Sequence, residues 1–329
     1  MTHLRLGTLI LISMVAARAH GAEPPAHPAP PGQAATPRAH PPGKLITVNG
    51  AKLWYESEGE GVSLVLVAGG PGRSHDYFHP WFSQFARSRR VIYFDAFGRG
   101  RSDRSKSAKE YTFDRDVEDL ERLRQALGLG KIDVLGASYG GMVAQAYALR
   151  HPGSVRRLVL VATLFSAEGW QVGNEILNGD IKEQLPEMWE KVLTVRGRGL
   201  RGSAPEHQAV YDPPLGLSWF YDRSNEAKLP KEPDAMNSEV YFAIAGDDAD
   251  FLVGGDVSRL DFRPQLKSLK MPVLITAGRY DRAVPPRLSL QFQDYAPQAR
   301  FVMFERSGHF IFIEEPGRFW EVVEDFLAR

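Results

Sequence analysis

The sequence contains no cysteine among its 329 residues. Disulfide bonds, thiol nucleophiles, cysteine-based zinc sites and a lipid anchored through cysteine are therefore excluded. Net charge is also lacking, because 40 Lys and Arg residues balance 40 Asp and Glu residues. Without a basic stripe or a global field, the chain is not expected to bind nucleic acid or an anionic membrane. We expect its partner to be a small or neutral molecule.

Sequence motifs for cofactors and metals are missing as well. There is no Gly-x-x-x-x-Gly-Lys loop, no dinucleotide fingerprint and no His-Glu-x-x-His pair. Each of these motifs places backbone amides or side chains around a particular ligand. The sequence therefore predicts neither a cofactor nor a metal.

The first residues have the pattern of an export signal. Arg5 precedes an apolar stretch from residue 6 to about residue 15, and Ala17 and Ala19 form an Ala-x-Ala-like cleavage site. A membrane anchor is the alternative, but roughly ten apolar residues are too few where about 20 are needed to span a bilayer. We predict a signal peptide over residues 1–21 and a mature protein that is exported, either to the periplasm or outside the cell.

Residues 22–43 are rich in proline and alanine. Such a composition buries little apolar surface and is typical of an extended, solvated linker. The segment includes His27 and His40, for which metal capture is the alternative interpretation.

Short apolar runs alternate with helical patterns in the rest of the chain. They predict buried parallel strands and a doubly wound α/β sheet, which begins with a hairpin around Asn49-Gly50. The expected strands cover residues 45–48, 52–56, 64–68, 91–95, 132–135, 158–162, 273–277 and 301–304, and the clearest helices cover residues 117–127, 142–149 and 319–327.

The alternation stops between residues 164 and 267. Aromatic clusters and amphipathic pieces replace it there, which predicts a mainly helical cap inserted into the sheet domain. The core is thus expected in two parts, residues 44–163 and residues 268–329.

The candidate nucleophile is Ser138, within the sequence Gly136-Ala137-Ser138-Tyr139-Gly140. This pattern follows a predicted strand and opens a predicted helix, as a nucleophile elbow requires. The flanking glycines let the neighbouring backbone approach a strained turn. An ordinary strand–helix turn is the alternative.

The candidate base and acid are His309 and Asp281. His309 follows the last predicted strand and Asp281 follows the strand before it, so both loops lie at the carboxyl edge of the sheet together with Ser138. The order Ser, Asp, His is the one found in α/β-hydrolases. The alternatives are a surface histidine and an ordinary turn aspartate. His75 and His79, in an early loop, are expected to face the site without serving as its base.

Two backbone amides are candidates for an oxyanion hole. One belongs to Tyr139, at the start of the helix after the serine. The other belongs to Gly70 in the loop Ala68-Gly69-Gly70-Pro71-Gly72. A tight glycine–proline turn without a chemical role is the alternative for this loop. The loop at residues 95–102 is interpreted as mostly structural.

Together, the Gly-Gly-Pro-Gly loop, the 95–102 loop, Gly-Ala-Ser-Tyr-Gly-Gly, Gly-Arg-Tyr-Asp and Ser-Gly-His resemble the proline iminopeptidase family of α/β-hydrolases. The resemblance runs from about residue 45 to the C-terminus. It implies removal of N-terminal residues from peptides, with the free amine held by carboxylates of the cap. By this resemblance Glu239 and Asp250 are candidate amine ligands; solvated surface acids are the alternative.

Three functions are compatible with these features. The first is an exported aminopeptidase or amidase that works through an acyl-enzyme. The second is an esterase or another small-molecule hydrolase with the same triad. The third is a ligand-binding protein that keeps the fold as a receptor.

Overall fold

The computed structural model describes residues 40–230, 232 and 234–329. The predicted signal peptide and residues 22–39 of the predicted linker lie outside this range. Among the helices of the described residues, none combines the length and apolar character that a membrane crossing needs.

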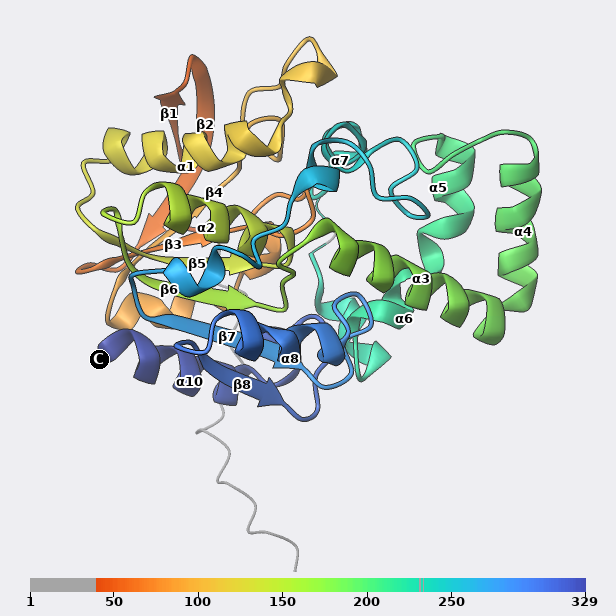
Figure 1. The fold of residues 1–329 in the computed structure, drawn as a ribbon. Coiled ribbons are helices and arrows are strands. Elements are labelled where there is room, and N and C mark those ends of the chain that lie inside the picture. The colour runs from red at the N-terminus through yellow and green to blue at the C-terminus, as the bar shows by residue number, and fades with distance from the viewer. Residues whose placement is uncertain (1–39, 231, 233) are drawn as a thin grey trace, which may run out of the picture. The chain divides into compact units, whose positions relative to one another are not determined.

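One eight-stranded sheet organises the described chain (Figure 1). Its strand order is β1-β2-β4-β3-β5-β6-β7-β8, with β1 and β2 antiparallel to their neighbours and all later pairings parallel. The strands are β1 (Lys44–Val48), β2 (Ala51–Glu58), β3 (Ser63–Val67), β4 (Arg90–Phe94), β5 (Ile132–Ala137), β6 (Val155–Val161), β7 (Val273–Gly278) and β8 (Arg300–Phe304). The predicted mostly parallel α/β fold is confirmed.

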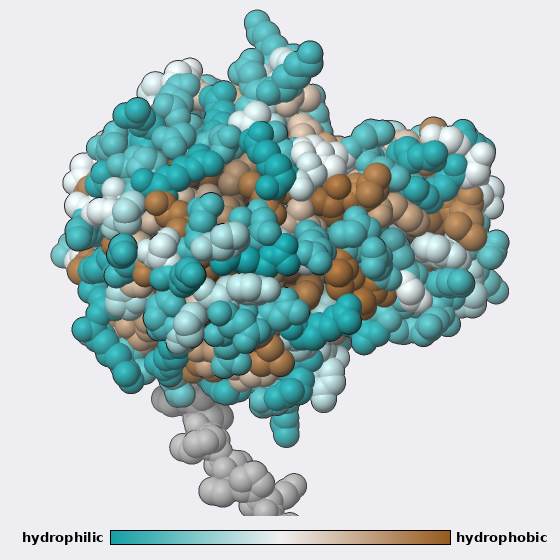
Figure 2. Space-filling view, viewed as in Figure 1, coloured by the Kyte–Doolittle hydropathy of each residue, from teal (hydrophilic) through white to brown (hydrophobic). Residues whose placement is uncertain are grey.

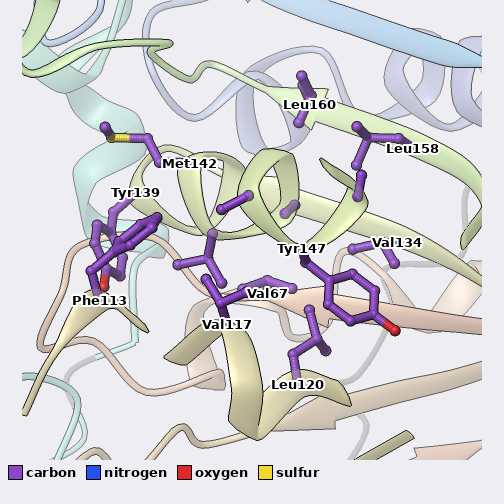
Figure 3. Packing of buried hydrophobic residues seen from close by; sticks show 14 of the residues in the cluster. Val67, Phe113, Val117, Leu120, Val134, Tyr139, Met142, Tyr147, Leu158 and Leu160 are labelled. Atoms are coloured by element: carbon purple, nitrogen blue, oxygen red, sulfur yellow. The ribbon is translucent and has the colours of Figure 1, made fainter. Parts of the chain in front are cut away.

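Helices α1 (Phe113–Ala126), α2 (Tyr139–Arg150) and α8 (Pro286–Tyr295) belong to the core on one face of this sheet. Figure 3 shows side chains of α1 and α2, including Val117, Leu120 and Met142, packed with strand residues such as Val134. These four side chains are fully buried. Since each buried side chain of this size contributes roughly 1.5–3 kcal/mol, this packing holds α2, and with it the end of β5, in place.

The opposite face carries a second buried cluster, built from short 3-10 helices η1 (Asp76–Phe78) and η2 (Ser83–Arg87) together with α9 (Ile311–Glu314) and α10 (Pro316–Ala328). Aromatic rings dominate it: Phe78, Phe82, Phe312 and Phe319 form a chain of ring contacts with centroids 4.8–6.1 Å apart. This cluster joins the segment after β3 to the segment after β8.

The chain between β6 and β7 is helical in the described residues. It contains α3 (Ala167–Gln184), α4 (Pro186–Gly197), α5 (Pro205–Tyr211), α6 (Gly216–Trp219) and α7 (Ser238–Ala245), with η4 (Pro213–Leu215), η5 (Arg223–Lys228), η6 (Asp256–Arg259) and η7 (Leu266–Ser268) between and after them. Figure 1 shows α3, α4 and α5 grouped beside the sheet. We call the chain between β6 and β7, residues 162–272, the helical lobe. In Figure 2, hydrophobic side chains gather on the visible face where the helical lobe meets the part of the chain that forms the sheet.

Helix boundaries differ from the expected ones where capping or a turn decides them. Helix α1 begins at Phe113, four residues before the expected start, because the Thr112 side chain accepts a hydrogen bond from the Arg115 amide at 3.1 Å. This cap satisfies one of the free amides of the first turn. Helix α2 begins directly at Tyr139, so its first turn carries the residues next to Ser138.

Gly136 offers a test of how tightly the end of β5 is packed. A Cβ atom there would lie 2.3 Å from the Gly140 carbonyl oxygen, which belongs to the backbone of α2. We expect Gly136→Ala to lower the free energy of unfolding by at least about 1–3 kcal/mol, since the clash is with main chain. Urea denaturation measures this change.

The matched control is Gly153→Ala, where a Cβ atom would meet nothing within 4 Å. We expect that change to stay within about 0.5 kcal/mol of the wild type. Equal stability of both variants would contradict the close approach of α2 to β5.

Candidate active site

Ser138 stands in a strained turn between β5 and α2. Its backbone has φ 52° and ψ −123°, which side-chain-bearing residues rarely adopt. Three hydrogen bonds hold the turn: the Ser138 amide donates to the Val161 carbonyl at 2.9 Å, and the Ser138 carbonyl accepts from the Gly141 amide at 2.9 Å and the Thr163 hydroxyl at 2.6 Å. Such strain persists only where the surroundings fix it, and it is typical of functional positions.

Asp281 and His309 form a buried pair on the loops after β7 and β8. The Asp281 Oδ2 atom lies 2.9 Å from His309 Nδ1, and its Oδ1 accepts the Val284 amide at 2.7 Å. A carboxylate only accepts hydrogen bonds, so it holds the proton on Nδ1 and leaves Nε2 free to accept another. The ring is thereby oriented as a general base requires.

The lobe contacts this loop directly. The His309 amide donates to the Trp219 carbonyl of α6 at 2.7 Å. On the other side, the Gly308 amide donates to Glu314 of α9 at 2.6 Å. The position of the imidazole therefore depends on a residue of α6 as well as on the sheet.

The loop after β3 presents an amide toward the same region. Gly70 has φ +62° and lines the cavity, and its amide donates to no acceptor within the described residues. The neighbouring Gly69 amide is already used, because it donates to the Tyr77 hydroxyl at 2.6 Å. This leaves Gly70, with the first amide of α2 at Tyr139, available to an anionic oxygen.

A buried hydrogen-bond network connects Tyr139 with the loop that carries Gly70, which we call the oxyanion loop (residues 68–72). The Tyr139 hydroxyl donates to Asp116 at 2.6 Å, and Arg99 binds both oxygens of that carboxylate at 2.6 and 2.7 Å. Arg99 Nε also donates to the Pro71 carbonyl at 2.5 Å. The 95–102 loop, interpreted as mostly structural, thus anchors the loop that carries Gly70.

A single cavity of about 390 Å³ joins these groups. Ser138, His309, Gly70 and Tyr139 line it together with residues of the helical lobe. Besides Tyr139, its aromatic lining consists of Tyr77, Trp170, Tyr211, Trp219, Tyr241, Phe242, Phe310 and Phe312. This volume and character suit a small organic molecule or one or two amino-acid residues.

The structure separates the two candidate amine ligands. Asp250 lines the cavity and its side chain is only 14% exposed. Glu239, in the first turn of α7, is exposed and does not belong to the cavity lining. Asp212, which follows α5 and was not predicted from the sequence, is a second carboxylate of the lining.

Burial of Asp250, followed by the negative charges of Asp212 and Asp248, raises the pKa of its carboxyl to about 7. Asp212 is more exposed, at the edge of the lining, and partial desolvation there also raises the pKa of its carboxyl. A cation placed between these carboxylates would stabilise their charged forms and lower both pKa values.

Two histidines expected near the site lie elsewhere, and an arginine that was not expected lies in the cavity. His75 and His79 do not line the cavity; their rings turn toward Glu56 on β2 instead. Arg73, which was not predicted from the sequence, lines the cavity, with its guanidinium 5.3 Å from the Trp219 ring centroid. Nothing in its sequence context distinguishes it from a surface arginine.

Comparisons with known proteins agree with this geometry. The family model described as "alpha/beta hydrolase fold" matches residues 62–316. The chain is 29% identical to a proline iminopeptidase of Heyndrickxia coagulans over 86% of its own length and 97% of the relative. It is 30% identical to a proline iminopeptidase of Saccharolobus solfataricus, over 86% of this chain and 90% of that one. The crystal structure of VinJ matches with a TM-score of 0.74 and 25% identity, covering 89% and 99% of the two chains.

Proposed function

Because this chain belongs to the α/β-hydrolase fold family, among the relatives of the proline iminopeptidases, we propose that it is a serine hydrolase that releases N-terminal residues from short peptides or amino-acid amides. The observation that carries the proposal is the shared cavity. One wall holds Ser138 and His309, and the helical lobe contributes the carboxylates of Asp212 and Asp250.

The reaction proceeds through an acyl-enzyme. His309 Nε2 takes the proton of the Ser138 hydroxyl as its oxygen attacks the substrate carbonyl, and Asp281 stabilises the imidazolium that forms. The amides of Gly70 and Tyr139 donate to the developing oxyanion. The imidazolium then protonates the leaving amine, and water hydrolyses the ester in a second passage through the same steps.

The two carboxylates account for a preference for free amines. A substrate ammonium that reaches Asp250 forms a charge-assisted hydrogen bond of roughly 1.5–3 kcal/mol. The ammonium also stabilises the ionised form of Asp250, which burial disfavours. The aromatic lining accepts the apolar part of the residue that is released.

A set of three substrates tests the proposal: an aminoacyl arylamide with a free amine, its N-acetylated form and a simple aryl ester. We expect kcat/KM for the free amine to exceed that for the acetylated form by about 10- to 100-fold, the worth of one charge-assisted hydrogen bond. The Ser138→Ala variant, with kcat lower by roughly 10⁶-fold, supplies the background rate. Equal cleavage with and without the acetyl group, or best cleavage of the ester, would favour the esterase alternative.

The pKa of Asp250 predicts a pH dependence of substrate binding. With a pKa of about 7, the carboxyl is neutral below that pH and charged above it. The substrate α-amine loses its proton near pH 7.7–8.0. We therefore expect 1/KM for the amine substrate to be greatest between about pH 7 and 8, where both groups are largely charged, and to fall about fivefold from that maximum to pH 6 as Asp250 takes up a proton. The aryl ester controls for titration of the triad.

Two variants distinguish the carboxylates named from the sequence. Asp250→Asn should raise KM for the amine substrate about 10- to 100-fold and flatten the decline of 1/KM at low pH. Glu239→Gln is the comparison, because that side chain is exposed and outside the lining. A larger KM effect from Glu239→Gln than from Asp250→Asn would assign the amine to the other carboxylate.

We also propose that the enzyme acts outside the cytoplasm, in the periplasm or as a secreted protein. The support is the N-terminal sequence, with Arg5, the apolar residues 6–15 and the Ala17-x-Ala19 site. N-terminal sequencing of the mature enzyme from its native host should begin near residue 22, and deletion of residues 6–15 should leave the enzyme in the cytoplasm. A mature protein that retains its first residues would contradict export by cleavage.

A further inference from the structure

A second cluster of functional side chains lies away from the catalytic cavity. It joins His40, Glu56 on β2, and His75 and His79 at the two ends of η1. One potential ligand atom from each residue lies within 4.8 Å of every other. None of the four residues lines the cavity of Ser138.

Two of the three contacts that Glu56 makes with these imidazoles share the oxygen Oε2, and they have the spacing of ligands of one small ion. Glu56 Oε2 lies 3.3 Å from His40 Nδ1 and 3.2 Å from His79 Nε2, while Glu56 Oε1 lies 3.3 Å from His75 Nε2. In a tetrahedral zinc site with metal–ligand bonds of about 2.0–2.1 Å, neighbouring ligand atoms lie about 3.3–3.4 Å apart.

Buried atoms without hydrogen-bond partners point into this cluster. Within the described residues, His75 Nε2, His79 Nε2 and Asp76 Oδ1 are buried and make no hydrogen bond. The side chains of Glu56, His75, Asp76 and His79 are all less than a tenth exposed. Leaving several buried polar atoms unsatisfied is costly, and an ion that binds them together removes that cost.

Neighbouring groups hold the ligands in the orientation that a metal needs. His75 Nδ1 lies 2.8 Å from Asp95 Oδ1. This carboxylate would hold the proton of a metal-binding imidazole on Nδ1 and leave Nε2 to present its lone pair to the ion. The His79 ring stacks on Tyr93 with centroids 4.1 Å apart. Trp54 Nε1 and Arg101 Nη1 each donate to Glu56 Oε1 at 3.2 Å, which leaves Oε2 facing His40 and His79.

The formal charges also favour a divalent cation. Three carboxylates, those of Glu56, Asp76 and Asp95, surround the imidazoles, and the Arg101 guanidinium balances one of them. Imidazoles bind a metal only when deprotonated; in that state the cluster carries two net negative charges, which one divalent ion neutralises. Buried charges are stable only when they are compensated in this way.

We propose that His40, Glu56, His75 and His79 form a structural binding site for a divalent transition-metal ion of the zinc class. Three imidazole nitrogens and one carboxylate oxygen suit zinc and its neighbours, whereas magnesium and calcium prefer all-oxygen sites. Asp76 Oδ1, 3.7 Å from His75 Nε2, provides a further oxygen. The ion reaches the site past His40, whose side chain is 34% exposed.

Binding would tie three distant segments together. His40 lies at the start of the described chain, Glu56 is on β2, and His75 belongs to the loop that continues from Gly70. The ion would therefore brace the outer side of the oxyanion loop without touching a substrate.

Zinc binding by the full chain, produced without a polyhistidine tag and stripped with a chelator, tests the proposal. Calorimetric titration with Zn²⁺, together with elemental analysis, should give one ion per chain, and Mg²⁺ should not compete. Zn²⁺ should also raise the melting temperature, since it binds the folded state selectively. His79→Gln should weaken Zn²⁺ at least about tenfold, because loss of even an outer partner of a metal ligand costs about 10- to 100-fold.

His40→Asn is the variant that keeps the test decisive if His79→Gln fails to fold, because His40 is partly exposed. It should weaken Zn²⁺ by at least about tenfold and remove the rise in melting temperature. His151→Asn, at a histidine outside the cluster beside Glu118, serves as the control and should bind like the wild type. Substoichiometric binding by the wild type, or equal affinity in the His40 and His151 variants, would overturn the proposal and leave the cluster as a network of protonated histidines.

Discussion

The backbone conformation of Ser138 is the constraint on which the candidate active site depends. A residue with a side chain at φ 52° costs about 1–3 kcal/mol, so the surrounding structure must enforce it. The absence of side chains at Gly136 and Gly140 allows α2 to pack against β5 and against the Val67 carbonyl. The serine consequently stands half-buried at the end of the sheet, with the amide of Tyr139 beside it. Relaxation of this turn would move the candidate nucleophile and the candidate oxyanion donor together.

Much of this arrangement could be predicted from the sequence because it is encoded locally. Continuous apolar runs predict buried parallel strands, and parallel strands bring their carboxyl ends to one edge of the sheet. Residues 138, 281 and 309 each follow such a run closely. Topology alone therefore placed Asp281 and His309 on neighbouring loops, and in the structure the two side chains are in contact.

The parts that could not be predicted depend on contacts between distant segments. Both Glu239 and Asp250 are acidic residues of the helical lobe, and only packing decides that Asp250 lines the cavity while Glu239 faces solvent. The cluster around Glu56 likewise depends on contacts between segments that are distant in the sequence. His40 lies in a proline-rich segment, where no ordered site was expected. His75 and His79 are four residues apart, as in a His-Glu-x-x-His motif, but Asp76 stands where that motif has glutamate. Their convergence becomes visible only when β2 and the loop after β3 are folded.

The position of the helical lobe between β6 and β7 governs when the enzyme can become active during its synthesis. Ser138 is made first, whereas Asp281 and His309 follow only after the whole lobe. Strands β7 and β8 then add to the free edge of β6 without rearranging the earlier pairings. A growing or truncated polypeptide therefore carries a serine with no base to activate it. The candidate triad is therefore complete only when the last strand and its loop have joined the sheet.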